Sequence, residues 1–358
     1  MSKRVGFYTS SHSWRNLQHW QFVNSAALAG KGWDVTVITT GKDRLYKRLR
    51  NKGINVIVFR KTGFLLPDVI RLSSLLKKHE ISTLFINYSR DLFLSGLAGK
   101  LGKTNKIVFR RGTVSGIKFN LLNRTIFRKG YVSQIVTNTE AHKKRIETLR
   151  PGLTKNLDFK VIYNGVNFNQ LEIVPELNRK YRQNGETIVG IADVRGAEKL
   201  FIQFLRYFKN CSTCKKNFRF LIYKRGITDK GIERAVNRLG LNGSVVWSVQ
   251  EKNIDQFLDS IDVYLSIQSG NKFNYPALYA MAHFKPVIGM SSGSDSELIE
   301  NNKNGFLYSG GDLNSVFNQL ELLTNKKYRE KIGENARASV EKKFNFDTSI
   351  KNIESIIE

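Results

Sequence analysis

A polar loop followed by a short apolar helix is the stretch of this sequence best suited to binding an anion. Residues 269–274 (SGNKFN) are mostly small or polar, which is typical of a loop. Pro276 suits the first turn of a helix, where its missing N–H is no loss. Lys285 and Pro286 end the helix before an apolar, strand-like run at 287–289. Because free N–H groups and the helix dipole attract negative charge, this loop is expected to be an anion site.

The chain also carries a large positive charge. Its 358 residues include 58 Lys and Arg against 30 Asp and Glu, a formal net charge of +28 at pH 7. Such a charge favours an anionic partner, which could be nucleic acid, an acidic lipid surface or a phosphorylated substrate. A generally basic proteome is the alternative explanation. Nucleic-acid binding has only the charge behind it, because no known reader motif is present and the aromatic residues do not cluster with the basic ones.

One region concentrates this charge. Residues 92–139 contain nine Lys and Arg and no Asp or Glu. Within them, residues 118–131 alternate apolar with basic side chains, such as Leu122 and Phe127 with Arg128. Such a segment can dock on an anionic membrane surface. It can equally be an amphipathic core helix with a solvated basic side, and both interpretations stay open.

The two cysteines, Cys211 and Cys214, form a C-x-x-C pair. A structural zinc site needs about four ligands, and the sequence has no second pair. A redox pair would be expected in a thioredoxin-like context, which is also missing. The sequence therefore predicts two free thiols on a solvated loop, and it shows no metal motif.

The elements that must position these residues alternate between strands and helices. A strand at 3–9, a helix at 20–31 and a strand at 34–40 predict a Rossmann-like opening. The alternation continues along the chain, so the fold class is α/β, and the length favours two domains. An apolar run of about eighteen residues and a secretory signal are both missing, which predicts a cytoplasmic protein.

Residues 269–289 resemble the nucleotide-sugar signature of the family 4 glycosyltransferases, which are retaining enzymes with the GT-B fold. The signature reads roughly E-G-F-x-x-x-L-x-E-A-M-A-x-G-x-P-V, and this chain matches it at Phe273, Leu278, Ala280, Met281, Ala282, Pro286 and Val287. Asn271 and Tyr279 replace its two glutamates. In the family the first glutamate contacts the transferred sugar and the second binds the ribose hydroxyls. Asn271 can still hydrogen-bond a sugar, whereas Tyr279 offers one hydroxyl where a carboxylate would accept two bonds.

The resemblance implies two Rossmann-like domains that face a central cleft. Residues 1–165 would form an N-terminal, acceptor-binding domain, and residues 160–166 (KVIYNGV) resemble the motif that ends it. Residues 166–186 would be the hinge, and 187–340 the nucleotide-sugar-binding domain. Residues 341–358 would form a helix that crosses back to the first domain.

The family pattern also assigns roles to individual residues. Arg195 and Lys199 fall where the family clamps the nucleotide diphosphate and neutralises charge as it departs, although a solvated basic loop is an alternative. Arg111, or its neighbour Arg110, ends the fifth predicted strand, where many members have a histidine. The expected catalytic residues are therefore Arg195, Lys199, Asn271 and Arg111. The expected donor-binding residues are Val249, Gly270, Lys272, Phe273, Asn274 and Tyr279. In the first loop, His12 and Arg15 are expected on the acceptor side.

The resemblance implies a retaining, metal-independent glycosyltransferase. It would move a sugar from a nucleotide-sugar donor to a surface polysaccharide or lipopolysaccharide-type acceptor, in the cytoplasm at the inner face of the membrane. The leaving phosphate can take the acceptor's proton, so the protein supplies charge stabilisation and positioning. No cofactor is expected, because the nucleotide sugar is a substrate. The replaced glutamates leave an alternative open, which is a GT-B-fold scaffold or binding subunit without catalysis.

Overall fold

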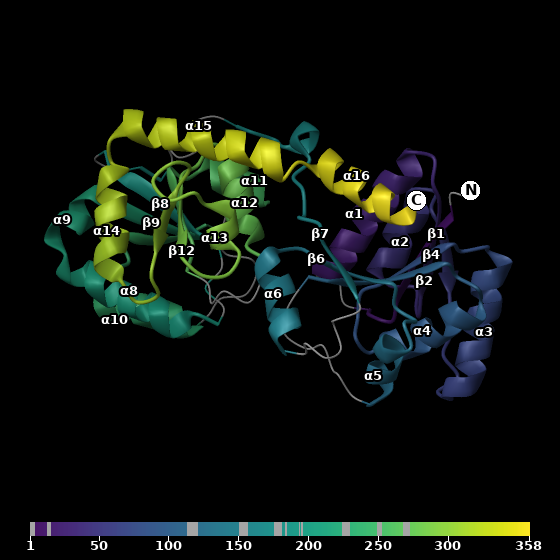
Figure 1. Ribbon diagram of the computed structural model, residues 1–358. Helices are drawn as coiled ribbons and strands as arrows, with labels where there is room; N and C mark the ends of the chain where they lie inside the picture. The colour runs from purple at the N-terminus through teal and green to yellow at the C-terminus, as the bar shows by residue number, and fades with distance from the viewer. Residues whose placement is uncertain are drawn as a thin grey trace. The chain divides into compact units, whose positions relative to one another are not determined.

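Two compact units make up the protein, shown as a ribbon in Figure 1. Unit 1 comprises Met1–Asn164 together with Asp347–Glu358, and unit 2 comprises Gly165–Phe346. The structure is a computed structural model, and it describes residues 4–12, 16–112, 121–149, 157–174, 181–182, 185–192, 194, 196–223, 230–248, 253–267 and 273–358.

Unit 1 is built on a parallel sheet of seven strands in the order β3-β2-β1-β4-β5-β6-β7. A parallel sheet is covered on both faces, so its strands are near-continuous apolar runs, and β4 (TLFI) is buried along its whole length. The strands are β1 (Arg4–Thr9), β2 (Asp34–Thr39), β3 (Asn55–Val58), β4 (Thr83–Ile86), β5 (Lys106–Arg111), β6 (Gln134–Thr137) and β7 (Asp158–Val161).

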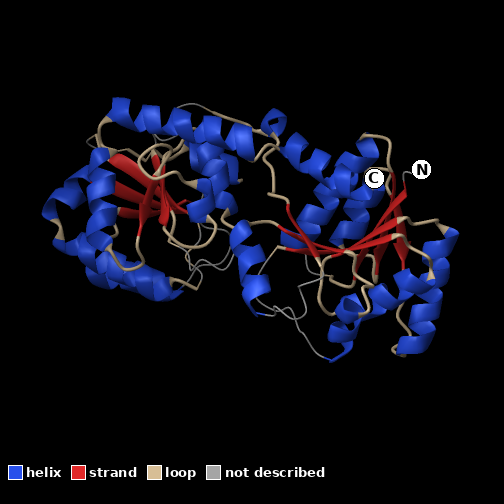
Figure 2. Ribbon diagram, in the orientation of Figure 1, coloured by secondary structure: helices blue, strands red, loops and turns tan. Residues whose placement is uncertain are grey.

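Helices cover both faces of this sheet, as Figure 2 shows. Its helices are α1 (Asn16–Gly30), α2 (Arg44–Asn51), α3 (Leu65–Lys78), α4 (Leu92–Leu101), α5 (Leu121–Arg128), α6 (Glu140–Leu149) and α16 (Phe346–Ile357). Helices α3, α4 and α5 pack in sequence on one face, and α1 and α2 pack together on the other.

Unit 2 contains a parallel sheet of six strands in the order β10-β9-β8-β11-β12-β13. The central strand β8 is entirely buried, as expected for a strand with helices above and below it. The strands are β8 (Thr187–Ile191), β9 (Phe218–Tyr223), β10 (Val245–Ser248), β11 (Val263–Leu265), β12 (Val287–Met290) and β13 (Phe306–Tyr308).

The helices of unit 2 also lie on both faces of its sheet (Figure 2). Helices α8 and α10 contact each other on one face, while α12 contacts α11 and α15 on the other. The helices are α8 (Glu198–Asn210), α9 (Ser212–Asn217), α10 (Lys230–Leu239), α11 (Ile254–Asp259), α12 (Tyr275–Ala282), α13 (Asp295–Leu298), α14 (Leu313–Leu322) and α15 (Lys326–Lys343). Among the described residues of both units, no helix combines the length and apolar character needed to cross a membrane.

The unit boundaries differ in detail from the predicted domain limits. The segment predicted as a hinge, 166–186, belongs by its contacts to unit 2. There the Val174 N–H donates to Asp259 Oδ2 at 2.7 Å, and Arg182 pairs with Asp262 at 2.7 Å. The last helix begins at Phe346, later than the predicted 341, and its buried Ile353 belongs to unit 1.

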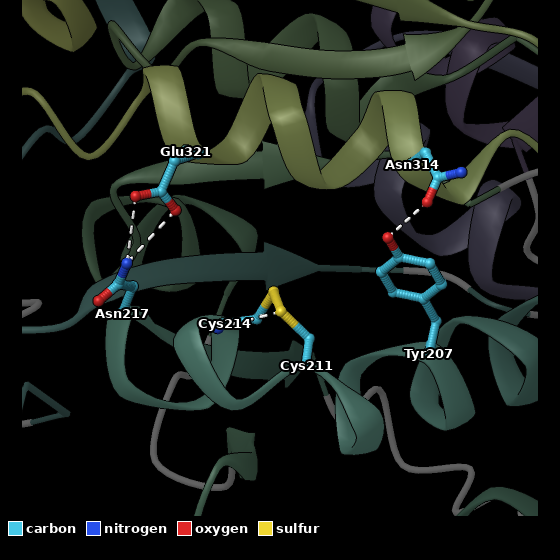
Figure 3. The surroundings of a disulfide bond; sticks show 6 residues. All are labelled: Tyr207, Cys211, Cys214, Asn217, Asn314 and Glu321. Atoms are coloured by element: carbon cyan, nitrogen blue, oxygen red, sulfur yellow. Dashed lines mark hydrogen bonds between the residues drawn. A yellow bond between two sulfur atoms is a disulfide. The ribbon is translucent and has the colours of Figure 1, made fainter.

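The two cysteines form a disulfide (Figure 3), so the prediction of free thiols on a solvated loop is wrong. Cys211 is the N-cap of α9, and its Sγ accepts the Cys214 N–H at 3.2 Å. One helical turn thus brings the two residues within a Cα–Cα distance of 5.2 Å, which a disulfide can span. Cys214 is buried in the core of unit 2. Nearby hydrogen bonds join α8 and the end of α9 to α14, from Tyr207 to Asn314 and from Asn217 to Glu321.

Candidate functional site

Unit 2 has a topological switch point between β8 and β11. These strands are neighbours in the sheet, but the chain leads from β8 to α8 on one face and from β11 to α12 on the other. In open α/β sheets, ligands bind in the crevice that such a divergence opens at the carboxyl ends of the strands. Lys199, at the start of α8, and Tyr279, in α12, follow these two strands. The sheet therefore brings predicted donor residues to one edge.

Lys199 lies in the first turn of α8, and its side chain is exposed. The N-cap residue of this helix, Ala197, makes no side-chain capping bond. Glu198 is the local acid, and its Oε1 accepts the Gly196 N–H at 2.8 Å. An open helix N-terminus with a lysine beside it suits a phosphate group, because the dipole, the N–H groups and the ammonium all favour negative charge.

Asn274 is 1% exposed, and its amide is used within the protein. Its Oδ1 accepts the Ala277 N–H at 3.1 Å, which caps α12. Its Nδ2 donates to Ser266 Oγ and to Asp295 Oδ1, each at 2.8 Å. Asn274 therefore shapes the site by fixing where α12 begins, and its backbone N–H is used as well, donating to Ser294 Oγ at 2.9 Å.

Phe273 and Tyr279 differ in how they are placed. Phe273 is buried and packs against the rings of Tyr275, at 5.0 Å, and Phe344, at 6.4 Å. Tyr279 is only half-buried. Burial, and then the negative charge of Asp255, raise the pKa of Tyr279 to about 12. Its hydroxyl therefore keeps its proton at neutral pH and can donate a hydrogen bond.

His283 follows α12 and is held between two aspartates. Its Nδ1 lies 2.7 Å from Asp259 Oδ1, and its Nε2 lies 3.0 Å from Asp255 Oδ1. Burial alone lowers the pKa of His283, but the hydrogen bonds and charges of both aspartates outweigh it, so the pKa is raised above its ordinary value. The charged imidazolium, with both ring N–H groups donating, is the form that this geometry favours.

We expect the free energy of unfolding to fall as the pH rises above about 6.5, the pKa of an unfolded histidine. The folded protein holds the His283 proton more tightly, so this stabilisation is complete below the unfolded pKa and is lost as the pH rises through the folded one. Denaturant unfolding at several pH values measures it. A His283→Gln variant should give a flatter profile over that window, and identical profiles would contradict the assignment.

Unit 1 has its own switch point, between β1 and β4. Buried polar residues follow β4 at the carboxyl end of the sheet, among them Asn87 and Asp91. Asp91 is 0% exposed and accepts the Ser10 N–H at 2.9 Å through Oδ2, and burial raises its pKa. The Asn87 amide is buried too, and it makes no hydrogen bond with a described residue. The edge where the acceptor is predicted to bind thus holds polar groups that the sequence did not single out.

Two residues predicted for this edge, His12 and Arg111, are described, and they belong to the ends of different strands. His12 follows β1, and its exposed ring lies 3.3 Å from Thr40 Oγ1 and 3.8 Å from Asp43 Oδ2, both beyond β2. Arg111 is the last residue of β5 and is 5% exposed. Burial, and then the charge of Arg110, lower the pKa of Arg111 to about 10. Arg110 is bonded to Asn164 at 3.0 Å.

Helix α5 buries two of its apolar residues but leaves Leu122 50% exposed. Ile126 is 0% exposed and Phe127 is 4% exposed, and both belong to the core of unit 1. Arg128 and Lys129 are exposed. Among the described residues 121–131, the helix thus packs Ile126 and Phe127 into the core and leaves Leu122 exposed with the basic side chains, so membrane docking through it stays a prediction.

Several predicted site residues lie outside the described residues. They are the proposed catalytic residues Arg195 and Asn271, the donor residues Val249, Gly270 and Lys272, and Arg15 on the acceptor side. Their roles stay predictions. Within the described ranges, no group of three or more His, Cys, Asp or Glu is placed to hold a metal ion.

Comparison with known proteins decides the family. Residues 25–170 match the family model described as Glycosyltransferase Family 4, and residues 175–339 match the model described as Glycosyl transferases group 1. The chain belongs to the glycosyltransferases of this type. Both halves of this glycosyltransferase are matched, so the resemblance seen at residues 269–289 extends over nearly the whole chain.

Known proteins resemble this glycosyltransferase along its full length. The N-acetyl-alpha-D-glucosaminyl L-malate synthase of Bacillus anthracis is 22% identical, over 92% of this chain and 90% of the relative. The capsular polysaccharide biosynthesis glycosyltransferase CapM of Staphylococcus aureus is 24% identical, with the same coverage. A crystal structure of Anabaena Alr3699/HepE in complex with UDP is 19% identical, covers 99% of both chains and has a TM-score of 0.81. At this identity the structural likeness establishes the GT-B fold.

Three buried or half-buried aspartates of this glycosyltransferase were not found from its sequence. Asp91 lies at the edge of unit 1, and Asp255 and Asp295 lie next to α12 in unit 2. Each is held by a partner distant in the sequence, so no local spacing marks it. The sequence offers one general indication: acids are few in this basic chain, and an acid that is buried needs a hydrogen-bond or ion-pair partner.

Proposed function

We propose that this protein transfers a sugar from a nucleotide-sugar donor to a glycan acceptor, with retention of configuration and without a metal ion. The main support is Lys199 at the open N-terminus of α8, beside the strand switch point of unit 2. As the bond from the sugar to the diphosphate breaks, negative charge grows on the phosphate. Lys199 and the N–H groups of α8 can stabilise that charge.

On this proposal the acceptor hydroxyl attacks the sugar carbon on the face that the phosphate leaves. The new carbon–oxygen bond forms there, and the hydroxyl proton passes to the leaving phosphate. The protein then needs no nucleophile of its own, only charge stabilisation and positioning. This chemistry needs no cofactor, because the nucleotide sugar is itself consumed.

The substrates are suggested by relatives. The Anabaena structure contains UDP, which supports a nucleoside diphosphate sugar as the donor. The name of the Staphylococcus relative refers to capsular polysaccharide biosynthesis, which supports a surface polysaccharide acceptor. A lipopolysaccharide-type acceptor belongs to the same chemical class.

A donor screen tests the proposal. UDP-, GDP-, ADP-, TDP- and CMP-sugars are incubated with the protein, and thermal stabilisation and slow release of free nucleotide are followed. Stabilisation and release with one donor would support the transferase and identify its base. Failure to respond to any donor would contradict it and favour the second candidate, a scaffold without catalysis. The replacement of both signature glutamates, by Asn271 and Tyr279, motivates that candidate.

We also propose that the protein associates with an anionic membrane surface, through the start of α3. Four large apolar residues are exposed there: Phe64 by 73%, Leu65 by 47%, Leu66 by 70% and Ile70 by 54%. We call these four residues the α3 patch. An apolar cluster of this kind on a protein surface marks an interaction site, and insertion into the acyl boundary of a bilayer would bury it.

The charges around the α3 patch fit an anionic surface. Arg60, Lys61 and Arg71 surround it in the sequence, and Arg71 has a side chain 50% exposed. The one acid of this segment, Asp68, is 3% exposed and accepts bonds from Thr62. Exposed charge in residues 60–71 is therefore positive, and each cation near an anionic surface contributes about 1 kcal/mol.

We expect the double variant Phe64→Ser, Leu66→Ser to bind phosphatidylglycerol-containing vesicles at least about tenfold more weakly, because the apolar surface that inserts is removed. Co-flotation with vesicles measures this. Leu322→Ser is the matched control, since Leu322 is 55% exposed on α14 of unit 2. Unchanged binding by the double variant would contradict docking through the α3 patch.

A further inference from the structure

The disulfide of unit 2 closes a very short loop. Cys211 and Cys214 are only three positions apart in the sequence, and a disulfide stabilises a fold less when the loop that it closes is shorter. The turn between them also has hydrogen bonds of its own. The Cys214 N–H donates to Cys211 Sγ, and the Lys215 N–H donates to the Cys211 carbonyl, each at 3.2 Å. Stability alone therefore does not explain the bridge.

The two bridged cysteines differ in their access to solvent. Cys214 is 7% exposed and lies in the core of unit 2. Cys211 is only half-buried at the junction of α8 and α9 (Figure 3), and the next two residues, Ser212 and Thr213, are exposed. Exchange with another thiol requires access to one of the two sulfur atoms. The bridge is therefore open to attack at Cys211 and shielded at Cys214.

Positive charge is concentrated around the bridge in the sequence. Arg206, Lys209, Lys215 and Lys216 are all exposed, and residues 199–228 contain no Asp or Glu. The thiolate is the reactive form of a cysteine, and nearby cations favour it. They also attract an attacking thiolate, which is itself negatively charged. Reactive cysteines are found in partly exposed, electropositive surroundings of this kind, whereas buried structural cysteines are inert.

Other contacts hold this part of unit 2 together independently of the bridge. The Tyr207 hydroxyl donates to Asn314 Oδ1, and the Tyr207 ring stacks on Phe317 at 4.8 Å, so α8 is joined to α14. At the end of α9, Asn217 Nδ2 donates to Glu321 Oε1 at 3.2 Å, which engages the one carboxylate that these contacts bring to the region. Unit 2 should therefore stay folded when the bridge is reduced.

We infer that Cys211 and Cys214 form a reversible thiol–disulfide exchange site whose partner is a dithiol. A thiolate of the partner attacks Cys211 Sγ and forms a mixed disulfide. The bond to Cys214 breaks, and the Cys214 sulfur takes the electron pair and then a proton. The partner's second thiolate attacks the partner sulfur of the mixed disulfide and releases Cys211 as a thiolate, which is protonated in turn. The protein gains two electrons and two protons, and the partner becomes a disulfide.

The first test uses the full-length wild-type protein, with dithiothreitol as the dithiol. The folded protein is equilibrated at several ratios of reduced to oxidised dithiothreitol, free thiols are alkylated, and mass spectrometry counts and locates them. We expect a reversible change between the bridged and dithiol forms with unchanged far-UV circular dichroism. When iodoacetamide is limiting, it should modify Cys211 of the reduced protein at least about tenfold faster than Cys214, because a buried thiol is shielded.

Two single variants then separate the roles of the cysteines. Cys214→Ala leaves an accessible thiol without its partner, so it should accumulate a stable mixed disulfide with oxidised glutathione. Cys211→Ala should form one at least about tenfold more slowly, because its remaining thiol is buried. Both variants should react at equal rates in denaturant, where burial is lost, and thermal unfolding checks that each variant folds.

The role of charge is tested in the Cys214→Ala background. Adding Lys215→Gln and Lys216→Gln should slow the reaction with oxidised glutathione several-fold, because this disulfide is anionic. Adding Lys77→Gln and Lys78→Gln instead is the matched control, since these two lysines are also adjacent and exposed, in the last turn of α3 in unit 1.

Three results would overturn the inference. If dithiothreitol reduces the bridge only in denaturant, or if reduction unfolds unit 2, the disulfide is a structural bridge. If the two cysteines of the folded, reduced protein are alkylated at equal rates, the site lacks the one-sided access that exchange at Cys211 requires. None of these results bears on sugar transfer, because the inference is independent of the proposed function.

Discussion

The Lys199→Ala variant should lose about 10²–10³-fold in kcat/KM for sugar transfer, the loss that removal of one preorganised charge-stabilising group typically causes. The ammonium lies in the first turn of α8, where the departing diphosphate is proposed to bind. Because charge on the phosphate grows toward the transition state, kcat should fall more than donor affinity. Steady-state kinetics with the donor found in the screen measures both.

The same helix supplies a matched control for this variant. Lys209 is exposed in the last turn of α8, away from the strand switch point, and Lys209→Ala should leave transfer unchanged. Lys199→Arg should recover part of the activity, because the charge is kept while its geometry changes. Transfer by Lys199→Ala at the wild-type rate would refute the assignment of the diphosphate site.

The Asp295→Ala variant should reduce the free energy of unfolding by about 3 kcal/mol, because it leaves buried donors without their acceptor. Asp295 Oδ2 accepts from Ser266 Oγ at 2.7 Å and from the Met290 N–H at 3.2 Å, and Oδ1 accepts from Asn274 at 2.8 Å. Since Asn274 caps α12, the loss should also loosen the start of that helix. Denaturant unfolding gives the energy, and amide exchange reports the first turn of α12.

A substitution at the next residue of α13 serves as the control for Asp295→Ala. Ser296 is exposed, and its hydroxyl bonds only locally to the Gly293 carbonyl. Ser296→Ala should therefore cost less than about 1 kcal/mol. If both variants lost the same free energy of unfolding, the buried hydrogen bonds of Asp295 would not be the cause of the loss.

The fold could be predicted because its signals are local. Strand β2 begins at Asp34, where the sequence predicts a strand, and α12 begins near Pro276 as expected. Helix α2 gave no such signal. It is short, half of its residues are basic, and only Leu45 and Leu49 are buried.

The candidate site was predicted less completely, because its polar contacts join distant parts of the chain. Lys199 could be found from its place in a motif, but the side chain of Asn274 is turned inward by Asp295. Asp255, on α11, is held by His283, which follows α12. The disulfide was missed as well, because it depends on Cys211 capping α9, a short helix that the sequence did not predict.

The way unit 1 is assembled bears on how the protein is made. Its sheet and most of its helices come from Met1–Asn164, but Asp347–Glu358 also belongs to it, with Ile350 and Ile353 in its interior. Unit 2 is one unbroken segment between these two parts. During synthesis, where domains generally fold as they emerge, the first unit to appear is the last to be completed. Until residues 347–358 leave the ribosome, unit 1 keeps an uncovered apolar surface. A stop codon placed just before these residues would release a protein with a complete unit 2 and an incomplete unit 1. The incomplete unit would be a target for chaperones and proteases.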